Sequence, residues 1–248
     1  MKNMNSPSNM KIISWNLNHR TIEKPIPDDI VIFFEQYAPD IIVLNEYVDG
    51  ESRNKFKQKL KELGYSHQLL SPKVGRQNQI FIASKNEIIL GDISAPDFTE
   101  PARTNFLHVT MAETNLELAG LRAPFYKLAR ERKAYWKQVS EIMAGVSKRQ
   151  ILFLGDINYD PFMNGSITEP DIKFDLVGSF RIPNPEGEWS FISIDGKNKS
   201  RIDHVIVSES VKASNVKYLT AYNGITLAGS KSDSAITDHA VLSIEVEI

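Results

Sequence analysis

The strongest constraint on the fold of this chain is a series of short runs of β-forming residues spread over almost its whole length. Residues 151–154, Ile-Leu-Phe-Leu, are continuously apolar, which is typical of a strand covered on both faces. Ile80 and Ile82 alternate with other residues, as in a strand with one buried face. The predicted strands are residues 11–15, 40–44, 79–83, 87–93, 105–111, 116–121, 150–154, 201–207 and 240–246.

Three segments between these runs carry apolar residues at helical spacing. The first begins at Pro27-Asp28-Asp29, the second covers residues 51–63 and ends at Gly64, and the third covers residues 128–143. The expected apolar faces are Ile30, Phe33, Phe34 and Tyr37 in the first helix, and Leu128, Tyr135, Val139 and Ile142 in the third.

Many strands with few helices favour one α/β domain in which two sheets pack together beneath outer helices. A predicted hairpin over residues 69–83 implies antiparallel pairing, so mixed sheets fit better than a doubly wound parallel sheet. The chain has 248 residues, of which 42% are hydrophobic and 24% charged, as in an ordinary folded globule. We expect a single domain over residues 10–248 after a polar, flexible tail over residues 1–9.

The apolar runs are far too short to span a bilayer, and the first ten residues lack the apolar core of a secretory signal. We therefore expect a cytoplasmic protein. The sequence does not determine the oligomeric state, for which a monomer is favoured. The chain has no cysteine, which excludes disulfides, thiolate metal sites and cysteine nucleophiles. A metal would be held by carboxylate, amide, histidine and water ligands, which suit magnesium, manganese or calcium.

Polar residues stand where the predicted strands begin or end, and in α/β folds functional sites gather at strand ends. A carboxylate at the end of a buried strand needs a metal, hydrogen bonds or water to satisfy its charge. The five polar segments are Asn16-Leu17-Asn18, Asn45-Glu46, Gly155-Asp156-Ile157-Asn158, Arg201-Ile202-Asp203-His204 and Thr237-Asp238-His239.

Each segment also has a purely structural interpretation. Glu46 could be a surface carboxylate, and Asp156 and Asn158 could cap a turn after Gly155. His204 and His239 could be hydrogen-bonded structural histidines. The occurrence of all five segments in a fixed order favours a functional site over chance.

These segments, with Trp15 before Asn16 and Trp189-Ser190-Phe191 before residue 201, resemble the endonuclease/exonuclease/phosphatase superfamily of metal-dependent phosphoesterases. The resemblance covers about residues 10–248 and is specific for the superfamily, not for a substrate. It implies a four-layer αββα sandwich, with two mixed sheets packed face to face and helices outside.

The resemblance also implies a role for each polar residue. Glu46 would be the principal ligand of one Mg2+ or Mn2+ ion, with Asn16 and Asn18 beside it and Asp238 completing the metal side. Nucleases of similar pattern often carry Asp at the position of Asn18, so Asn18 weakens any second metal position.

On the catalytic side, Asp156 would orient or activate the attacking water, and Asn158 would help to hold that water or the phosphate. His239 would contact the phosphate oxygens, and Asp203 would favour its charged form.

Arg122 marks a departure from the family pattern. It follows the predicted strand 116–121, where family members commonly have His or Tyr. A guanidinium cannot act as an acid near neutral pH, but it can hold a phosphate with two hydrogen bonds. The alternative is that Arg122 only forms a salt bridge with an acidic neighbour. Phe125 stands where abasic-site endonucleases have Asn, which argues against that specialisation.

We therefore expect a metal-dependent phosphoesterase, first of all a nuclease acting on DNA or RNA. Two alternatives stay open: a phosphatase or phosphodiesterase acting on a small phosphorylated molecule or lipid headgroup, and a non-catalytic phosphate-binding module. The net charge of −2 excludes a strongly basic nucleic-acid coat. Residues 126–149 carry seven basic and two acidic residues, which we interpret as the solvated face of a helix.

Overall fold

The computed structural model of the protein describes residues 9–18, 24–162 and 179–248. The predicted tail over residues 1–9 lies outside these residues, except for Asn9, which begins the first strand. Within the described part of the chain, no helix combines the length and the apolar character needed to cross a bilayer.

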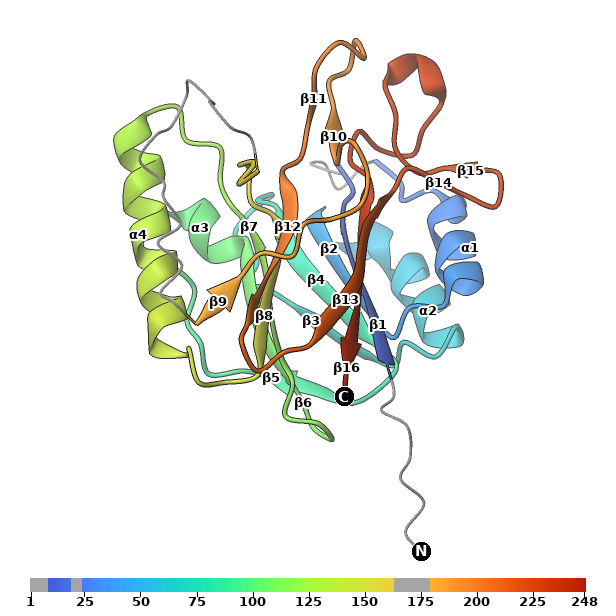
Figure 1. Ribbon diagram of the computed structural model, residues 1–248. Helices are drawn as coiled ribbons and strands as arrows, with labels where there is room; N and C mark the ends of the chain where they lie inside the picture. The colour runs from blue at the N-terminus through green and yellow to red at the C-terminus, as the bar shows by residue number, and fades with distance from the viewer. Residues whose placement is uncertain (1–8, 19–23, 163–178) are drawn as a thin grey trace, which may run out of the picture.

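Two six-stranded mixed sheets form the centre of the molecule (Figure 1). The first sheet has the order β13 (Ala213–Leu219), β16 (Val241–Glu247), β1 (Asn9–Asn16), β2 (Ile41–Tyr47), β4 (Gln79–Ser84) and β3 (His67–Leu70). The second sheet has the order β5 (Ile88–Leu90), β6 (Phe106–Met111), β7 (Glu117–Arg122), β8 (Ile151–Asp156), β12 (Asp203–Ser208) and β9 (Phe180–Arg181). The pairs β1–β2 and β7–β8 are parallel, and the other pairs within these sheets are antiparallel.

Helices cover the outer face of each sheet, so the fold has the predicted four layers (Figure 1). α1 (Asp28–Tyr37) and α2 (Asn54–Glu62) lie on the first sheet, and α3 (Glu100–Thr104) and α4 (Ala129–Gly145) lie on the second. Two short hairpins, β10 (Phe191–Ile192) with β11 (Lys199–Ser200) and β14 (Ala221–Tyr222) with β15 (Ile225–Thr226), extend from one end of the sandwich. Single 3-10 turns occur at Glu51–Arg53 and Lys231–Asp233.

The alternation of side chains along the central strands builds the layers. In β8, Leu152 and Leu154 pack between the two sheets, while Ile151 and Phe153 face the helix layer. In β1, Ile12 packs between the sheets and Ile13 faces α1. This explains why residues 151–154 are apolar without interruption: both faces of that strand are buried.

The apolar faces of the helices agree with the prediction for α1 and only in part for α4. In α1, the four predicted residues are buried. In α4, the buried residues are Tyr135, Trp136, Val139 and Met143. Leu128 is 47% exposed because it precedes the first turn of the helix, and Ile142 is only partly buried. The predicted stripe was therefore wrong at one end, where the helix begins one residue later than expected.

The other boundaries differ by a few residues. The hairpin predicted over residues 69–83 is present as β3 and β4, paired in antiparallel fashion. The strand predicted over residues 87–93 is reduced to Ile88–Leu90, and β12 begins at Asp203 instead of residue 201. The short strands β9, β10, β11, β14 and β15 and the helix α3 were not predicted, because such short elements carry little periodic signal. The seven-residue strand β13 was also missed, since it pairs with β16 through a register shift and its burial does not alternate regularly.

Candidate active site

The carboxyl ends of the two parallel strand pairs meet at one end of the sandwich, the upper end in Figure 1. β1 and β2 bring Asn16 and Glu46 from the first sheet, and β7 and β8 bring Arg122 and Asp156 from the second. Two contacts join the sheets there. Asn16 Nδ2 donates a hydrogen bond of 3.1 Å to Asp156 Oδ2, and Arg122 Nη2 lies 2.7 Å from Glu46 Oε1.

Three residues at this end hold left-handed backbone conformations. Glu46 has a φ of 55°, where the pairing of β2 with β4 changes register, and its side chain is buried. Asn18 and Asn158 have φ values of 48° and 52°. Asn adopts this conformation more readily than most residues, but Glu does not. The strain at Glu46 is of the kind that recurs at functional sites.

Gly155 allows β8 to reach the site. Its φ is 146°, and a Cβ at this position would lie 1.9 Å from the carbonyl oxygen of Leu121 on β7. Only glycine fits this close approach of two backbones. The next residue, Asp156, is thereby placed at the carboxyl end of β8.

Asp156 is buried and held by two donors. Asn16 Nδ2 contacts one carboxylate oxygen, and the backbone N–H of Asn158 donates a hydrogen bond of 3.0 Å to the other. Burial and the nearby charge of Asp203 raise the pKa of Asp156 to about 6, although the charges of His239 and Arg122 act in the opposite direction. The carboxylate therefore exchanges its proton close to neutral pH.

His239 forms a buried ion pair with Asp203. The distance from His239 Nδ1 to Asp203 Oδ2 is 2.9 Å. Burial lowers the pKa of His239, but the charge and hydrogen bond of Asp203, with the charges of Asp156 and Asp238, outweigh it and raise the pKa to about 9. The imidazole is therefore protonated at neutral pH and donates to Asp203.

Neighbouring groups fix this pair in place. The Ser190 hydroxyl accepts hydrogen bonds from the backbone N–H groups of Ile202 and Asp203, and the ring of Phe191 lies 5.0 Å from that of His239. Ser190 and Phe191 belong to the segment Trp189-Ser190-Phe191, which is part of the resemblance to the superfamily. Among the described residues, Asp203 Oδ1 has no hydrogen-bond partner.

Asn18 connects Asn16 with Asp238. Asn18 Nδ2 donates a hydrogen bond of 3.1 Å to Asp238 Oδ2, and the backbone N–H of Asn18 donates to Asn16 Oδ1. The Asn158 side chain donates to the carbonyl oxygen of Ala123 instead of pointing to Asp156. The structure thus brings all nine predicted site residues to one end of the sandwich, including Asp203, which pairs in register with Asp156.

Arg122 lies between the carboxylates of Glu46 and Asp156. Its Nη2 is 2.7 Å from Glu46 Oε1, and its Nε is 3.6 Å from Asp156 Oδ2. The sequence left two roles open for Arg122, binding a phosphate or forming a salt bridge. Arg122 does form salt bridges, but its partners Glu46 and Asp156 are themselves predicted site residues, so the salt bridges also place Arg122 in the site. The carboxylates of Glu46 and Asp156 thus flank one place, with the amide of Asn16 bonded to Asp156. Carboxylate oxygens are ligands that a hard divalent cation prefers.

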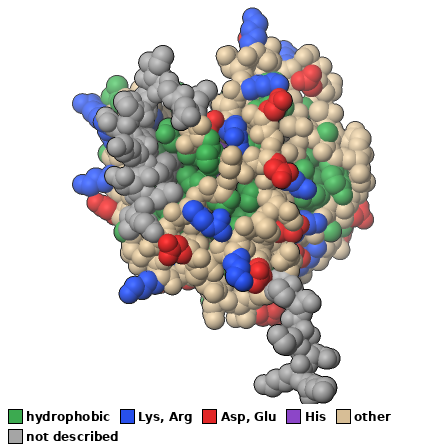
Figure 2. Space-filling view, viewed as in Figure 1, with side chains coloured by type: hydrophobic (Ala, Val, Ile, Leu, Met, Phe, Trp, Pro, Cys, Tyr) green, Lys and Arg blue, Asp and Glu red, His purple; other side chains and the backbone are tan. Residues whose placement is uncertain are grey.

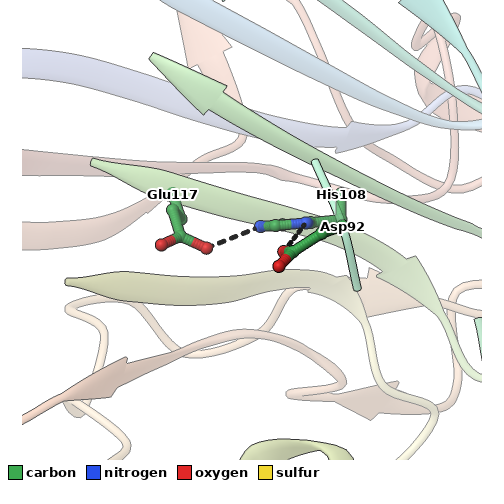
Figure 3. Close-up of side chains that lie close together, drawn as sticks. All are labelled: Asp92, His108 and Glu117. Carbon is green, nitrogen blue, oxygen red and sulfur yellow. Dashed lines mark hydrogen bonds and ion pairs between the residues drawn. The ribbon is translucent and has the colours of Figure 1, made fainter. Parts of the chain in front are cut away.

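A second group of titratable side chains lies away from this site and was missed in the sequence. Asp92, His108 and Glu117 come within 4.8 Å of one another (Figure 3). Glu117 begins β7, whereas Arg122 ends it, so this group is at the opposite end of the second sheet. Carboxylate and imidazole ligands at such distances could hold a metal ion.

The hydrogen bonds of this second group favour a structural role. Arg149 forms ion pairs with both Asp92 and Glu117. His108 Nε2 lies 2.9 Å from Glu117 Oε2, and its Nδ1 accepts a hydrogen bond from the backbone N–H of Ile93. Burial lowers the pKa of His108 despite the opposing charge of Glu117. Both ring nitrogens of the neutral His108 are hydrogen-bonded, and the neighbouring carboxylates are paired with Arg149. These contacts connect the segment after β5 to β6 and β7.

The comparison with known proteins agrees with a phosphoesterase fold. Residues 13–239 match the sequence model of the Endonuclease/Exonuclease/phosphatase family, and the chain belongs to this family. Its members are hydrolytic phosphoesterases. A comparison with curated protein sequences gives no significant match.

Solved structures share the fold at low sequence identity. An AP endonuclease from Archaeoglobus fulgidus has 16% identity and a TM-score of 0.69, over 96% of this chain and 100% of that one. D. rerio TDP2 in complex with a single-stranded DNA product has 16% identity and a TM-score of 0.68, over 97% and 100% of the two chains. A 3′ phosphatase, NExo, from Neisseria, bound to a product DNA hairpin, has 16% identity and a TM-score of 0.69, over 96% and 100%.

Proposed function

We propose that this protein is a divalent-metal-dependent phosphodiesterase that hydrolyses phosphodiester bonds in nucleic acid. The observation that carries the proposal is the buried His239–Asp203 ion pair beside Asp156. It places a fixed cation and a carboxylate with a pKa of about 6 in one site, at the strand ends of a phosphoesterase fold. Phosphodiester hydrolysis needs both an acceptor for the proton of water and positive charge for the phosphate oxygens.

On the metal side, the carboxylates of Glu46 and Asp238 and the amide oxygens of Asn16 and Asn18 would hold Mg2+ or Mn2+. Such an ion, when bound, polarises the phosphate oxygens and stabilises the charge that develops on them. Arg122 contacts Glu46 and therefore competes with the ion for part of the negative charge. A carboxylate has two oxygens that can each accept more than one partner, so Glu46 can serve both.

On the nucleophile side, Asp156 accepts the proton of the attacking water. Its two hydrogen bonds, from Asn16 and from the backbone of Asn158, fix the carboxylate plane. At neutral pH a carboxyl with a pKa of about 6 is mostly ionised, yet it is more basic than an ordinary aspartate. Asn158, whose side-chain N–H also bonds the carbonyl oxygen of Ala123, would help to hold this water or the phosphate.

His239 and Arg122 bind the phosphate oxygens. The imidazolium of His239 stays charged because Asp203 holds its other side, so it acts as a fixed hydrogen-bond donor. The guanidinium of Arg122 binds a phosphate with its planar fork and cannot supply a proton. Both cations are partly or fully shielded from water, where their charge is more effective than at the surface.

Nucleic acid is the substrate class that we propose first. Solved structures of similar fold include complexes of other proteins with DNA products. On the face of this protein shown in Figure 2, basic and acidic side chains are interspersed and do not form a basic field. The substrate is therefore expected to bind through contacts near the site more than through a general attraction to its phosphates.

The experiment is an incubation of the protein with supercoiled plasmid, single-stranded DNA, RNA and a panel of inositol phosphates, with Mg2+ or with EDTA. Metal-dependent cleavage of a nucleic acid that is lost in Asp156→Asn supports the proposal. Asp28→Asn, an exposed carboxyl on α1, is the control and should keep full activity. Phosphate release from the inositol phosphates alone favours the small-molecule phosphatase, and no hydrolysis of any substrate favours the phosphate-binding module.

Four further points stay proposals that simple measurements test. The preference for Mg2+ or Mn2+ is tested by reconstituting activity with each ion. Light scattering tests the monomeric state, cell fractionation tests the cytoplasmic location, and limited proteolysis tests the single domain over residues 10–248.

A further inference from the structure

A cavity of about 290 Å³ lies beside the proposed active site, between α4 and the segments that follow β7 and β8. Its lining reaches the site at Asn158. Five of its lining side chains are aromatic, namely Phe125, Tyr126, Tyr135, Trp136 and Tyr159. A cavity of this size lies at the lower end of the range for small-molecule sites, so it suits a single ring system and not an extended ligand.

Internal contacts hold the aromatic wall in place. The ring of Tyr135 lies 5.9 Å from that of Tyr126 and 5.3 Å from that of Trp136. The hydroxyl groups of Tyr126 and Thr99 are hydrogen-bonded at 2.6 Å, and Arg132 Nη1 donates to the carbonyl oxygen of Tyr126 at 2.6 Å. The wall is therefore preorganised, which reduces the entropy lost when a ligand binds.

The Tyr135 hydroxyl is an unpartnered polar group in this wall. Tyr135 is 1% exposed, and none of the described residues offers its hydroxyl a hydrogen-bond partner. Burial, and to a smaller extent Tyr126 and the charge of Asp156, raise the pKa of Tyr135 far above its usual value, although the charge of Arg122 opposes this. The hydroxyl is thus a protonated donor on a residue that lines the cavity. Buried polar groups in native proteins almost always have a partner, which points to a ligand at this position.

Phe125 extends the aromatic surface to the mouth of the cavity. Its side chain is 75% exposed, although it is one of the largest apolar side chains in the protein. An exposed aromatic ring at the rim of an aromatic cavity offers a face on which a flat ring can stack.

We propose that this cavity binds a nucleobase next to the phosphate that reacts. The base would stack on Phe125 and the aromatic wall, and a small shift of the wall would bring the buried Tyr135 hydroxyl to the polar edge of the base, which would accept its hydrogen bond. Flat rings with hydrogen-bonding edges are what aromatic sites with one polar group recognise in unpaired nucleic acid. The assignment rests on the proposed function, because it takes the base to belong to the nucleic-acid substrate.

The test uses nucleosides, which carry no phosphate and cannot be hydrolysed by a phosphoesterase. The full-length protein is titrated with deoxyadenosine, thymidine, 2-deoxyribose and benzyl alcohol, and binding is followed by saturation-transfer NMR. We expect saturation of the base protons and a Kd at least about tenfold lower for a nucleoside than for deoxyribose. Benzyl alcohol, an aromatic ring whose ring edge carries no hydrogen-bonding group, should bind more weakly than the nucleosides.

Two variants locate the binding. Phe125→Ala, at an exposed position that does not threaten folding, should raise the nucleoside Kd about fivefold or more, because stacking on one aromatic side chain is lost. Tyr135→Phe keeps the ring and should raise the nucleoside Kd several-fold, while the Kd of benzyl alcohol stays the same. Ile89→Ala, an equally exposed apolar residue on β5, is the matched control and should change neither.

Equal binding of nucleosides and deoxyribose would overturn the proposal, and so would nucleoside binding that neither cavity variant affects. Benzyl alcohol that binds as tightly as a nucleoside and ignores Tyr135→Phe would also overturn it, since the cavity would then accept any aryl group. Failure of the phosphodiesterase is a separate result: it appears as absent hydrolysis in the plasmid assay, whatever the nucleosides do.

Discussion

At the scale of single residues, Arg122 is the most unusual feature of the site. It takes the place beside Glu46 and Asp156 that a cation would also favour, and it joins the two sheets through Glu46. A fixed guanidinium there has two opposite effects. It weakens the attraction of Glu46 for a metal ion, and it adds a donor for the phosphate.

These two effects predict that Arg122→Ala lowers the rate of hydrolysis and raises the metal affinity. Loss of one charge-stabilising donor in a shielded site costs roughly 2–4 kcal/mol of barrier, or a rate loss of about 30-fold to 10³-fold. The Kd for Mn2+, measured by calorimetry, should fall because Glu46 loses its competing cation. Arg122→Lys should keep part of the activity.

Arg122→His sharpens this prediction. If position 122 touches the reacting phosphate or its leaving group, this variant should be substantially more active than Arg122→Ala and show a new pH dependence near 6.5. A wild-type rate in Arg122→Ala would show that Arg122 is only a structural salt-bridge residue.

At the scale of elements, the end of β8 depends on a glycine. Gly155 stands where any Cβ would collide with the backbone of β7, whereas Gly64, after α2, has a positive φ but open space around it. A comparison of Gly64 with Gly155 distinguishes two reasons why a position requires glycine. One is the backbone conformation alone, and the other is that conformation together with close contact between strands.

We therefore predict that Gly155→Ala destabilises the protein much more than Gly64→Ala. Gly64→Ala should lower the free energy of unfolding by about 1 kcal/mol, which is the strain of a left-handed residue. Gly155→Ala should lower it by at least about 3 kcal/mol, because β7 and β8 must also separate. Urea unfolding followed by circular dichroism measures both values, and equal values would contradict this account of Gly155.

The ion-pair network at the other end of the second sheet predicts a dependence of stability on pH. Burial lowers the pKa of His108 below its usual value, so the unfolded chain binds a proton at this residue more readily than the folded chain does. The contribution of His108 to stability is therefore present above the unfolded pKa of about 6.5 and is lost as the pH falls through that value.

The variant that tests this is His108→Gln, which keeps a hydrogen-bonding side chain but cannot be charged. Between pH 8 and pH 5, the free energy of unfolding should fall less steeply in the variant than in the wild-type protein. Identical slopes would show that His108 does not resist protonation. Burial also lowers the pKa of His204. Because His204 is present in both proteins, its contribution to the pH dependence is the same in each, and the difference between the two slopes reports on His108 alone.

At the scale of the whole molecule, the site joins the two sheets. Glu46 and Asn16 come from the first sheet and Arg122 and Asp156 from the second, so a ligand held there contacts both halves of the sandwich. Binding to this place should therefore stabilise the fold as a whole and not one local segment.

This predicts that Mg2+ or Mn2+ raises the melting temperature. At a metal concentration of 100 times the Kd, the stabilisation is about 2.7 kcal/mol, or roughly 5–10 °C for a protein of this size. Glu46→Gln should abolish most of the shift, whereas Glu117→Gln, in the group at the opposite end, should leave it unchanged. If Glu117→Gln abolished the shift in melting temperature and Glu46→Gln left it unchanged, the metal site would be the Asp92–His108–Glu117 group instead.

Much of the architecture could be predicted from local patterns. The runs of β-forming residues, the doubly apolar stretch at residues 151–154 and the buried face of α1 all follow from periodicity, because neighbouring side chains alternate in a strand and recur every three to four residues in a helix. The polar residues at strand ends could be found in the same way, since a strand that ends on a carboxylate stands out against its apolar run.

What local patterns could not supply are contacts between residues distant in the chain. Asn16 and Asp156, which bond across the two sheets, are 140 residues apart, and nothing near either residue specifies the other. The packing of the sheets decides that Arg122 meets Glu46, and the position of α4 on the second sheet decides that the core residue Tyr135 also lines a cavity. Strand pairing and layer packing fix such contacts, because they set which strand ends and helix faces share the same space.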